Sequence, residues 1–192
     1  MTPPPLLALY ASDTASSDDG VSHAPERAAA VSLDEAVRRY SAYVATIAFR
    51  LLGRQDEVDD VVQEVFLGAL KGLSALRDDG ALRSWLATVT VRTARRRLRQ
   101  RRWYSFVGLD DAPDYRETVA APGASPEELA TLARVYELLD TLPVDERVAW
   151  ALRHIHGDGL EAVAETCGCS LATVKRRIQA AQSAIERVMV DD

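Results

Sequence analysis

The residues with the clearest chemical potential are arginines. Seven of them stand within residues 92–102, and no acidic residue occurs in residues 81–104. Guanidinium groups crowded along one helix repel one another, so a compensating anion is expected, and a nucleic-acid backbone supplies one. Trp103, Tyr104 and Phe106 follow directly, and aromatic rings beside arginine suit stacking on unpaired bases. The alternative is a solvated basic helix with its aromatic rings in a core, which the density of arginine and the lack of acids disfavour.

A second group of hydrogen-bond donors stands near the C-terminus. Residues 160–166 have the pattern of a short helix, Gly168 permits the positive φ of a turn, and Ser170 suits the cap of a second helix. This order predicts a helix-turn-helix over residues 160–185. Its second helix carries donors for phosphates and major-groove base edges: Ser170, Thr173, Lys175, Arg176, Arg177 and Gln179. An ordinary helical hairpin with a solvated basic face is the alternative.

An acidic face precedes the arginines. Apolar residues from Val58 to Ala69 fall on one arc of a helix, and acidic or amide residues fall on the other. A face of one charge sign can dock a basic protein, although plain solvation is its usual explanation. The candidate docking residues are Asp56, Asp59, Asp60, Gln63 and Glu64.

Two histidines and two cysteines have side chains of the types that bind zinc. The spacing of His154 and His156 from Cys167 and Cys169 is not a usual structural zinc pattern. Both cysteines fall in the turn, where we expect small buried apolar side chains, and redox sensing is the less favoured alternative. The sequence also has no phosphate-binding glycine loop, nucleophile elbow or His-Glu-x-x-His motif. We therefore expect no enzymatic activity, no metal and no cofactor.

Helical periodicity places these groups in an all-α chain of two small helical domains. The helices are expected at about 33–51, 56–73, 81–102, 129–142, 144–155, 160–166 and 170–185. In the third helix the apolar stripe fades beyond Arg92. Residues 105–127 hold glycine, proline and acids, which is typical of a flexible acidic linker. The predicted organisation is a disordered tail over 1–31, a first domain over 32–104, the linker over 105–127 and a second domain over 128–192.

Composition bounds the class of protein. Hydrophobic residues make up 47% of the 192 residues and charged residues 27%, as in soluble globular proteins. No apolar run approaches the ~20 residues that cross a bilayer, and no basic residue precedes the first apolar stretch, so we expect a cytoplasmic protein without membrane insertion. The net charge of −6 argues only weakly against nucleic-acid binding, because the charges are segregated along the chain.

The order of these segments resembles the extracytoplasmic-function (ECF) sigma factors. Residues 56–67, DEVDDVVQEVFL, are similar to region 2.2 of that family. Residues 82–86, LRSWL, lead into the arginine-rich helix and resemble regions 2.3 and 2.4. Residues 142–147, LPVDER, and residues 160–178, with TVKRR at 173–177, resemble region 4. The resemblance covers about 33–103 and 128–188.

The resemblance implies a division of roles between the segments. The acidic face would bind core RNA polymerase at the β′ clamp helices, and the acidic linker would thread the polymerase channel. The segment 82–103 would melt and read the −10 element of promoter DNA, with Trp85 in the core. Its DNA contacts would be Arg92, Arg95, Arg96, Arg99, Arg102 and Trp103. The helix from Ser170 would read the −35 element, and an anti-sigma factor is a further partner to test.

Departures from the family pattern qualify these roles. Arg92 stands where many members have asparagine, which bears on −10 specificity. Ala180 and Gln182 stand where basic residues are common, and Cys167 and Cys169 replace larger aliphatic residues. Two other functions stay open on the sequence alone: a helix-turn-helix regulator that works without core polymerase, and a sigma-like protein-interaction module.

Overall fold

The computed structural model describes residues 32–70, 79–108 and 125–190, and everything described is helix, turn or short connection without a β-strand. The helices are α1 (Leu33–Leu52), α2 (Val58–Ala69), α3 (Asp79–Phe106), α5 (Pro126–Thr141), α6 (Val144–Ala151), α7 (Leu160–Cys167) and α8 (Leu171–Val190). A π-helical turn, η3 (Leu152–His156), extends α6. The all-α prediction is confirmed. The predicted tail and residues 109–124 of the predicted linker lie outside the described residues, and the two ends of that linker belong to α3 and α5.

Local sequence signals explain where α1 and α5 begin. The Ser32 side chain accepts a hydrogen bond from the backbone N–H of Glu35, which caps α1. Ser125 and Glu128 form a reciprocal capping box at the start of α5, whose first residue is Pro126. These caps satisfy backbone donors that have no partner inside the helix.

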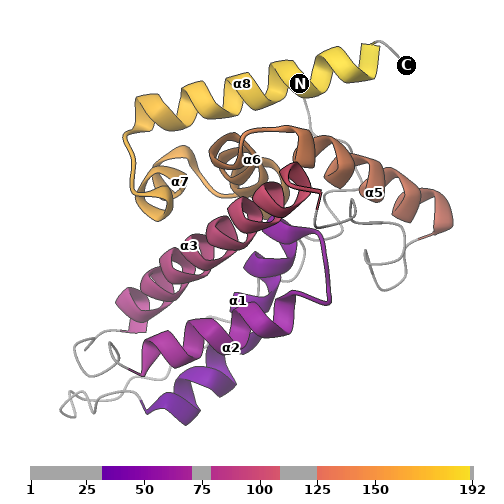
Figure 1. Cartoon of the computed structure of the whole chain (residues 1–192). Coiled ribbons are helices and arrows are strands. Elements are labelled where there is room, and N and C mark those ends of the chain that lie inside the picture. The colour runs from indigo at the N-terminus through magenta and orange to yellow at the C-terminus, as the bar shows by residue number, and fades with distance from the viewer. Residues whose placement is uncertain (1–31, 71–78, 109–124, 191–192) are drawn as a thin grey trace.

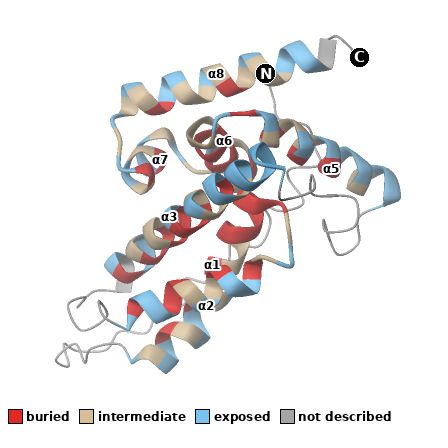
Figure 2. Ribbon diagram, viewed as in Figure 1, coloured by how far each residue is buried: buried red, intermediate tan, exposed pale blue. Residues whose placement is uncertain are grey.

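Helix α3 is the central element of the fold. It packs against α1 and α2 on one side and against α6 and α7 on the other, while α8 lies across the outer face of α6 and α7 (Figure 1). The buried residues of both halves of the chain form one continuous cluster, so the two helical units share a packed seam (Figure 2). Within the described residues, no helix is long and apolar enough to cross a membrane.

The apolar stripe of α3 extends farther than its sequence suggests. Ala94 and Leu98 are almost fully buried, so the prediction that the stripe fades beyond Arg92 is wrong. A few small or isolated apolar residues among the arginines are enough to pack the helix against the core. The aliphatic stems of the arginines can lie beside these residues while the guanidinium groups reach outward. Trp85 is partly buried against the core, near its expected place.

Candidate nucleic-acid and protein interfaces

The acidic face divides into two groups. Asp59 and Gln63 are exposed on α2, and neither pairs with any residue that the structure describes. Asp60 and Glu64 instead face α3 and form ion pairs with it. Asp56 lies just before α2, where its hydrogen bond from Arg54 (2.6 Å) lowers the pKa of its carboxyl. The outward charge available to a protein partner is therefore centred on Asp59.

Acids of the same chain neutralise much of the arginine-rich helix. Arg96 pairs with Glu64, Arg97 lies 3.3 Å from Asp60, and Arg101 lies 2.5 Å from Glu57. The expected compensating anion is thus present within the protein, and the density of arginine does not by itself require nucleic acid. Sequence spacing could not reveal these pairs, because their members are more than 30 residues apart in the chain.

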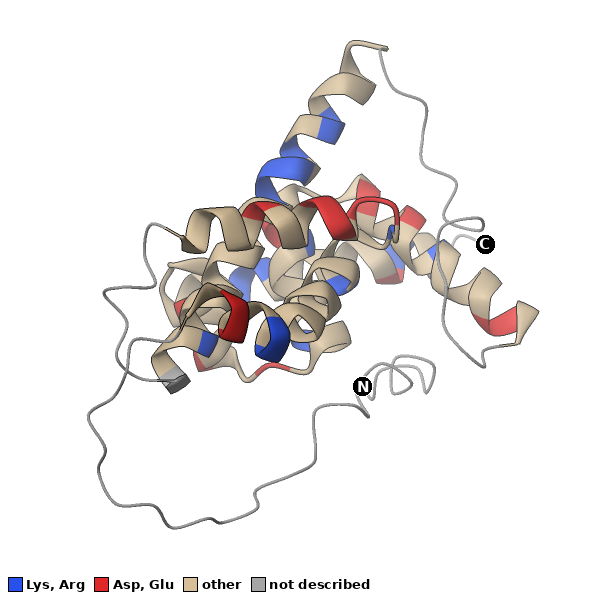
Figure 3. Cartoon of the chain, turned by 90° about the horizontal axis from the view of Figure 1, so that it is seen from below, with Lys and Arg blue, Asp and Glu red and all other residues tan. Residues whose placement is uncertain are grey.

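Part of α3 nevertheless presents an unpaired surface, from Arg92 in the middle of the helix to the aromatic residues at its end. Arg92 is exposed and makes no ion pair among the described residues. Trp103 is 58% exposed and Phe106 is 87% exposed, so these aromatic rings are not in the core. Trp103 makes an edge contact with Tyr104, with ring centroids 5.3 Å apart. Figure 3 shows this end of α3 projecting beyond the helical body, with the acidic turn of α2 beside its base.

Three other arginines of α3 point toward the second helical unit. Arg95 lies 3.0 Å and Arg99 3.1 Å from a carboxylate oxygen of Asp145, at the start of α6. Arg102 donates to the backbone oxygen of Leu142 (3.0 Å). The structure therefore separates the predicted −10 residues: Arg92 and Trp103 are open to a ligand, while Arg95, Arg96, Arg99 and Arg102 are engaged within the chain.

The helix-turn-helix residues are separated in the same way. Gly168 ends α7 in the left-handed conformation (φ 64°), and the Ser170 hydroxyl accepts from the N–H of Thr173 (3.2 Å) to cap α8. Lys175, Arg176 and Gln179 are exposed along α8. Arg177, by contrast, turns inward and donates to Asp145 at 2.8 Å.

The cysteines and histidines have structural surroundings. Cys167 is buried, which raises the pKa of its thiol to about 11, and Cys169 lies 3.5 Å from a guanidinium nitrogen of Arg177. The His154 ring packs 4.9 Å from the Trp150 ring, and burial lowers its pKa. Among the residues that the structure describes, no three His, Cys, Asp or Glu side chains are placed to hold a metal ion.

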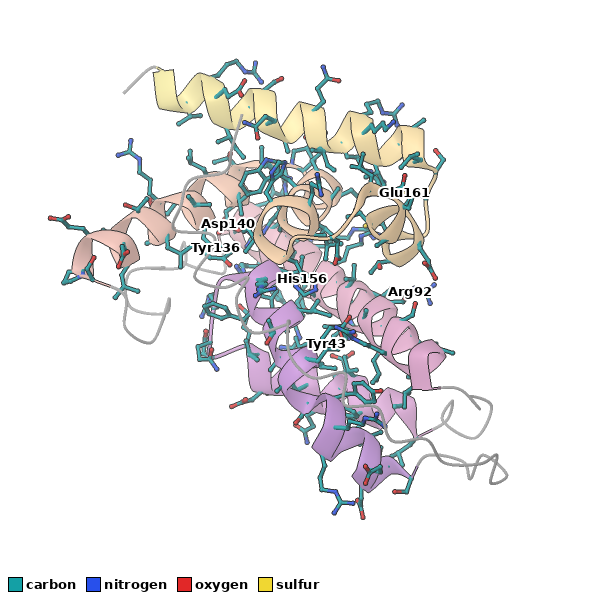
Figure 4. The ribbon with its side chains drawn as sticks, turned by 180° about the vertical axis from the view of Figure 1, so that it is seen from behind. Tyr43, Arg92, Tyr136, Asp140, His156 and Glu161 are labelled. Atoms are coloured by element: carbon teal, nitrogen blue, oxygen red, sulfur yellow. The ribbon has the colours of Figure 1, made fainter. Side chains whose placement is uncertain are left out.

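Sequence reasoning missed the residues that join the two helical units. Arg147 is 1% exposed, although arginine is usually a surface residue. It donates to backbone oxygens of Leu51 and Leu52 in the last turn of α1. Arg50 of α1 is also buried at this seam, and so is Tyr136 of α5, which Figure 4 labels. The sequence segment LPVDER contains Asp145 and Arg147, but no periodic signal links them to partners that lie 46 to 96 positions earlier in the chain.

Known proteins match both halves of the chain. The family models Sigma-70 region 2 and Sigma-70, region 4, match residues 36–104 and 132–184. The ECF RNA polymerase sigma-E factor of Escherichia coli is 33% identical over 158 residues, which cover 78% of this chain and 82% of that protein. The RNA polymerase sigma-H factor of Pseudomonas aeruginosa is 31% identical over 164 residues, covering 81% of this chain and 85% of that protein.

Two solved structures share the fold. One is the sigma factor RpoE in complex with the anti-sigma factor NepR from Bartonella quintana, with a TM-score of 0.61 and 21% identity over 83% of this chain and 97% of that chain. The other is CnrH in complex with the cytosolic domain of CnrY, with a TM-score of 0.53 and 24% identity over 97% of this chain and 96% of that chain.

Proposed function

The chain belongs to the ECF family of RNA polymerase sigma factors, and from this premise we propose how its surfaces divide the work of promoter recognition. As a member of that family it binds core RNA polymerase and directs promoter-specific transcription initiation, without a catalytic step of its own. The family match favours this function over a regulator that works without core polymerase and over a sigma-like interaction module. Its site of action is the bacterial cytoplasm.

The exposed part of the acidic face is the proposed contact with core polymerase. Asp59 and Gln63 project from α2 without a partner in the described chain, and Asp56, Asp60 and Glu64 flank them. A basic surface on the β′ clamp helices would be attracted to this face, and the attraction would weaken with salt. Because Asp60 and Glu64 already pair with α3, Asp59 carries the largest share of the contact.

The exposed residues of α3, from its middle to its C-terminal end, are the proposed −10 surface. Arg92 and Trp103 offer a cation and a ring to a melted strand, where stacking on an aromatic ring is worth roughly 1–3 kcal/mol per base. Lys175, Arg176 and Gln179 on α8, with Ser170 and Thr173 at its start, are the proposed −35 surface. One observation carries this assignment. Within the two matched regions, an acidic surface is exposed on α2, a surface of arginine and aromatic residues on α3, and the donors of the helix-turn-helix on α8.

Reconstitution with bacterial core polymerase tests the assignment. The sharpest variant is Asp59→Lys with Gln63→Lys, because neither side chain has a partner to lose among the residues that the structure describes. Glu137→Lys is the matched control, since Glu137 is exposed on α5 and also unpaired among the described residues. With the wild type and the control, we expect a pool of host promoter fragments to give run-off transcripts with defined starts. With the double variant, we expect the complex with polymerase to be at least tenfold weaker. Absence of any complex between wild type and core enzyme would overturn the proposal.

An anti-sigma protein is a further proposed partner. The support is that one of the two solved structures is a sigma factor bound to an anti-sigma factor. Co-purification of the full chain from its native host, with mass spectrometry of the bound proteins, tests this proposal. A preparation that contains only polymerase subunits would contradict it.

A further inference from the structure

We propose that the cavity between α1, α3 and α7 binds a free amino acid with an apolar side chain. The cavity has a volume of about 340 Å³, at the small end of the roughly 300–1,000 Å³ that is typical of ligand pockets. None of the residues that line it belongs to the proposed polymerase, −10 or −35 surfaces. The site is therefore an addition to promoter recognition, and the free chain is enough to test it.

The floor of the cavity is apolar. It is formed by Ile47 of α1, Val91 of α3 and Leu152 of η3, each of which is 1% exposed to solvent. Ala87 and Ala162 line the same cavity with small side chains, which leave space that larger residues would fill. Transfer of an apolar group from water onto such a surface is favourable. A ligand that is charged throughout, such as inorganic phosphate, would gain nothing from this floor.

His156 supplies a hydrogen-bond donor inside the cavity. Its side chain is only 8% exposed, and a pKa of about 4 keeps its imidazole neutral at neutral pH. Its Nδ1 lies 2.8 Å from Nη1 of Arg50, and a guanidinium can only donate, so Nδ1 accepts and the ring proton is on Nε2. Asp158 Oδ1 lies 3.8 Å from Nε2, which is beyond hydrogen-bond distance. This N–H is therefore available to an acceptor on a ligand.

Arg83 places a positive charge at the rim of the same cavity. Its guanidinium carbon lies 4.6 Å from the centroid of the Tyr43 ring, and it forms no ion pair among the residues that the structure describes. The rings of Tyr43 and His156 are 6.4 Å apart, centroid to centroid, where α1 meets η3 (Figure 4). A guanidinium and an imidazole N–H are both donors to a carboxylate. This side of the cavity suits the carboxylate of an amino acid.

Two acids give the cavity the opposite charge as well. Glu165 is exposed on α7, and its Oε1 accepts a hydrogen bond from the hydroxyl of Ser84 (3.4 Å). Burial raises the pKa of the Asp158 carboxyl, and a cation beside it would lower that pKa again. An ammonium group would supply such a cation. The cavity thus presents donors for a carboxylate, acids for an ammonium and an apolar floor for a side chain, which together describe an apolar amino acid.

Titration calorimetry of the full free chain with leucine, valine and phenylalanine tests the site. We expect saturable binding of at least one of them, with one site per chain. For each amino acid that binds, two matched probes each lack one group: the carboxylic acid without the ammonium, and the amine without the carboxylate. Both probes should bind at least tenfold more weakly, because each leaves charged groups of the cavity without a partner.

Three variants place the ligand in this cavity. Arg83→Gln and Glu165→Gln each remove one charge, and Ala162→Leu fills the space from an exposed position on α7, so each should weaken binding at least tenfold. Glu161→Gln is the matched control, because Glu161 is exposed one turn before Glu165 and does not line the cavity. It should bind as the wild type does. Circular dichroism of each variant shows that helix content is retained.

Wild-type protein that binds none of the three amino acids saturably would overturn the proposal. So would affinities that are equal in Glu161→Gln and in all three cavity variants, or an amine or acid probe that binds as tightly as its amino acid. None of these results bears on promoter recognition, because the measurement contains neither polymerase nor DNA.

Discussion

His156 is an ionisable side chain enclosed at the seam. Burial, together with the nearby cations Arg50 and Arg83, lowers its pKa from 6.5 to about 4, and Arg50 Nη1 lies 2.8 Å from its Nδ1. The folded chain therefore holds a neutral imidazole in contact with a guanidinium. Protonation would place two cations at hydrogen-bond distance.

The stability of the folded chain should fall on acidification below pH 6.5. A histidine with a depressed pKa contributes its full stability above its unfolded pKa and loses it as the pH falls from 6.5 toward 4. At pH 5.5 the loss is about 1 kcal/mol. Urea unfolding at pH 7.5 and 5.5 measures this loss. The variant His156→Gln separates it from the effect of Asp158, whose raised carboxyl pKa makes the folded chain more stable as the pH falls. An equal pH dependence in wild type and His156→Gln would contradict the assignment.

Gly53 offers a second prediction at this scale. Gly53→Ala would force a Cβ into the Tyr136 ring and strain a backbone at φ 72°, so we expect a loss of roughly 2 kcal/mol or more in the free energy of unfolding. Gly68→Ala is the control, because nothing lies within 4 Å of its Cβ position inside α2. There alanine should stabilise the helix by roughly 0.5–1 kcal/mol. Chemical denaturation that finds the same sign for both substitutions would count against the packing described.

Helix α3 is part of the core and is also a proposed DNA-binding element. A substitution at its exposed end tests the second role without disturbing the first. Trp103→Ala should leave the folded chain as stable as the wild type, because the ring is 58% exposed. Open-complex formation should fall about tenfold, for a loss of about 1.4 kcal/mol of stacking. Permanganate reactivity of promoter thymines in the reconstituted complex measures the melted strand. Val188→Ala, an exposed apolar position on α8, should have no effect on it.

Helix α8 carries the corresponding prediction for duplex DNA. Lys175→Ala and Arg176→Ala should each weaken promoter binding by the polymerase complex and reduce the slope of log affinity against log salt by about one. Arg187→Ala changes the same charge in the last turn, where its guanidinium bonds the backbone oxygen of Ser183, and should alter neither quantity. Filter binding over a series of salt concentrations separates the two cases. A salt slope that is unchanged in all three variants would remove α8 from the interface.

Across the whole molecule, sequence patterns predicted what is local. The Ser32 cap, the Gly53 end of α1 and the turn at Gly168 follow from residue type alone. The extent of the buried stripe of α3 was underestimated, because Leu98 lies in the core among arginine neighbours that conceal it in the sequence. The burial of Arg147 could not be predicted, since its acceptors are the carbonyls of another helix about 95 residues away. The compensating anion predicted for the arginines is supplied within the chain, by acids of α2 and by Asp145 of α6, which spacing along the sequence could not reveal.

Asp145 also bears on how this protein can change over generations. Arg177 has two roles to reconcile, since its sequence position predicts a −35 contact while in the structure it is a partner of Asp145. A substitution at Arg177 that alters the preferred promoter would also remove the contact that joins α8 to the start of α6. Promoter choice and the packing of α8 are therefore inherited together at this position. A lineage that acquires a new target sequence through Arg177 should carry a compensating change at position 145, and one that retargets through Lys175 or Arg176 should not.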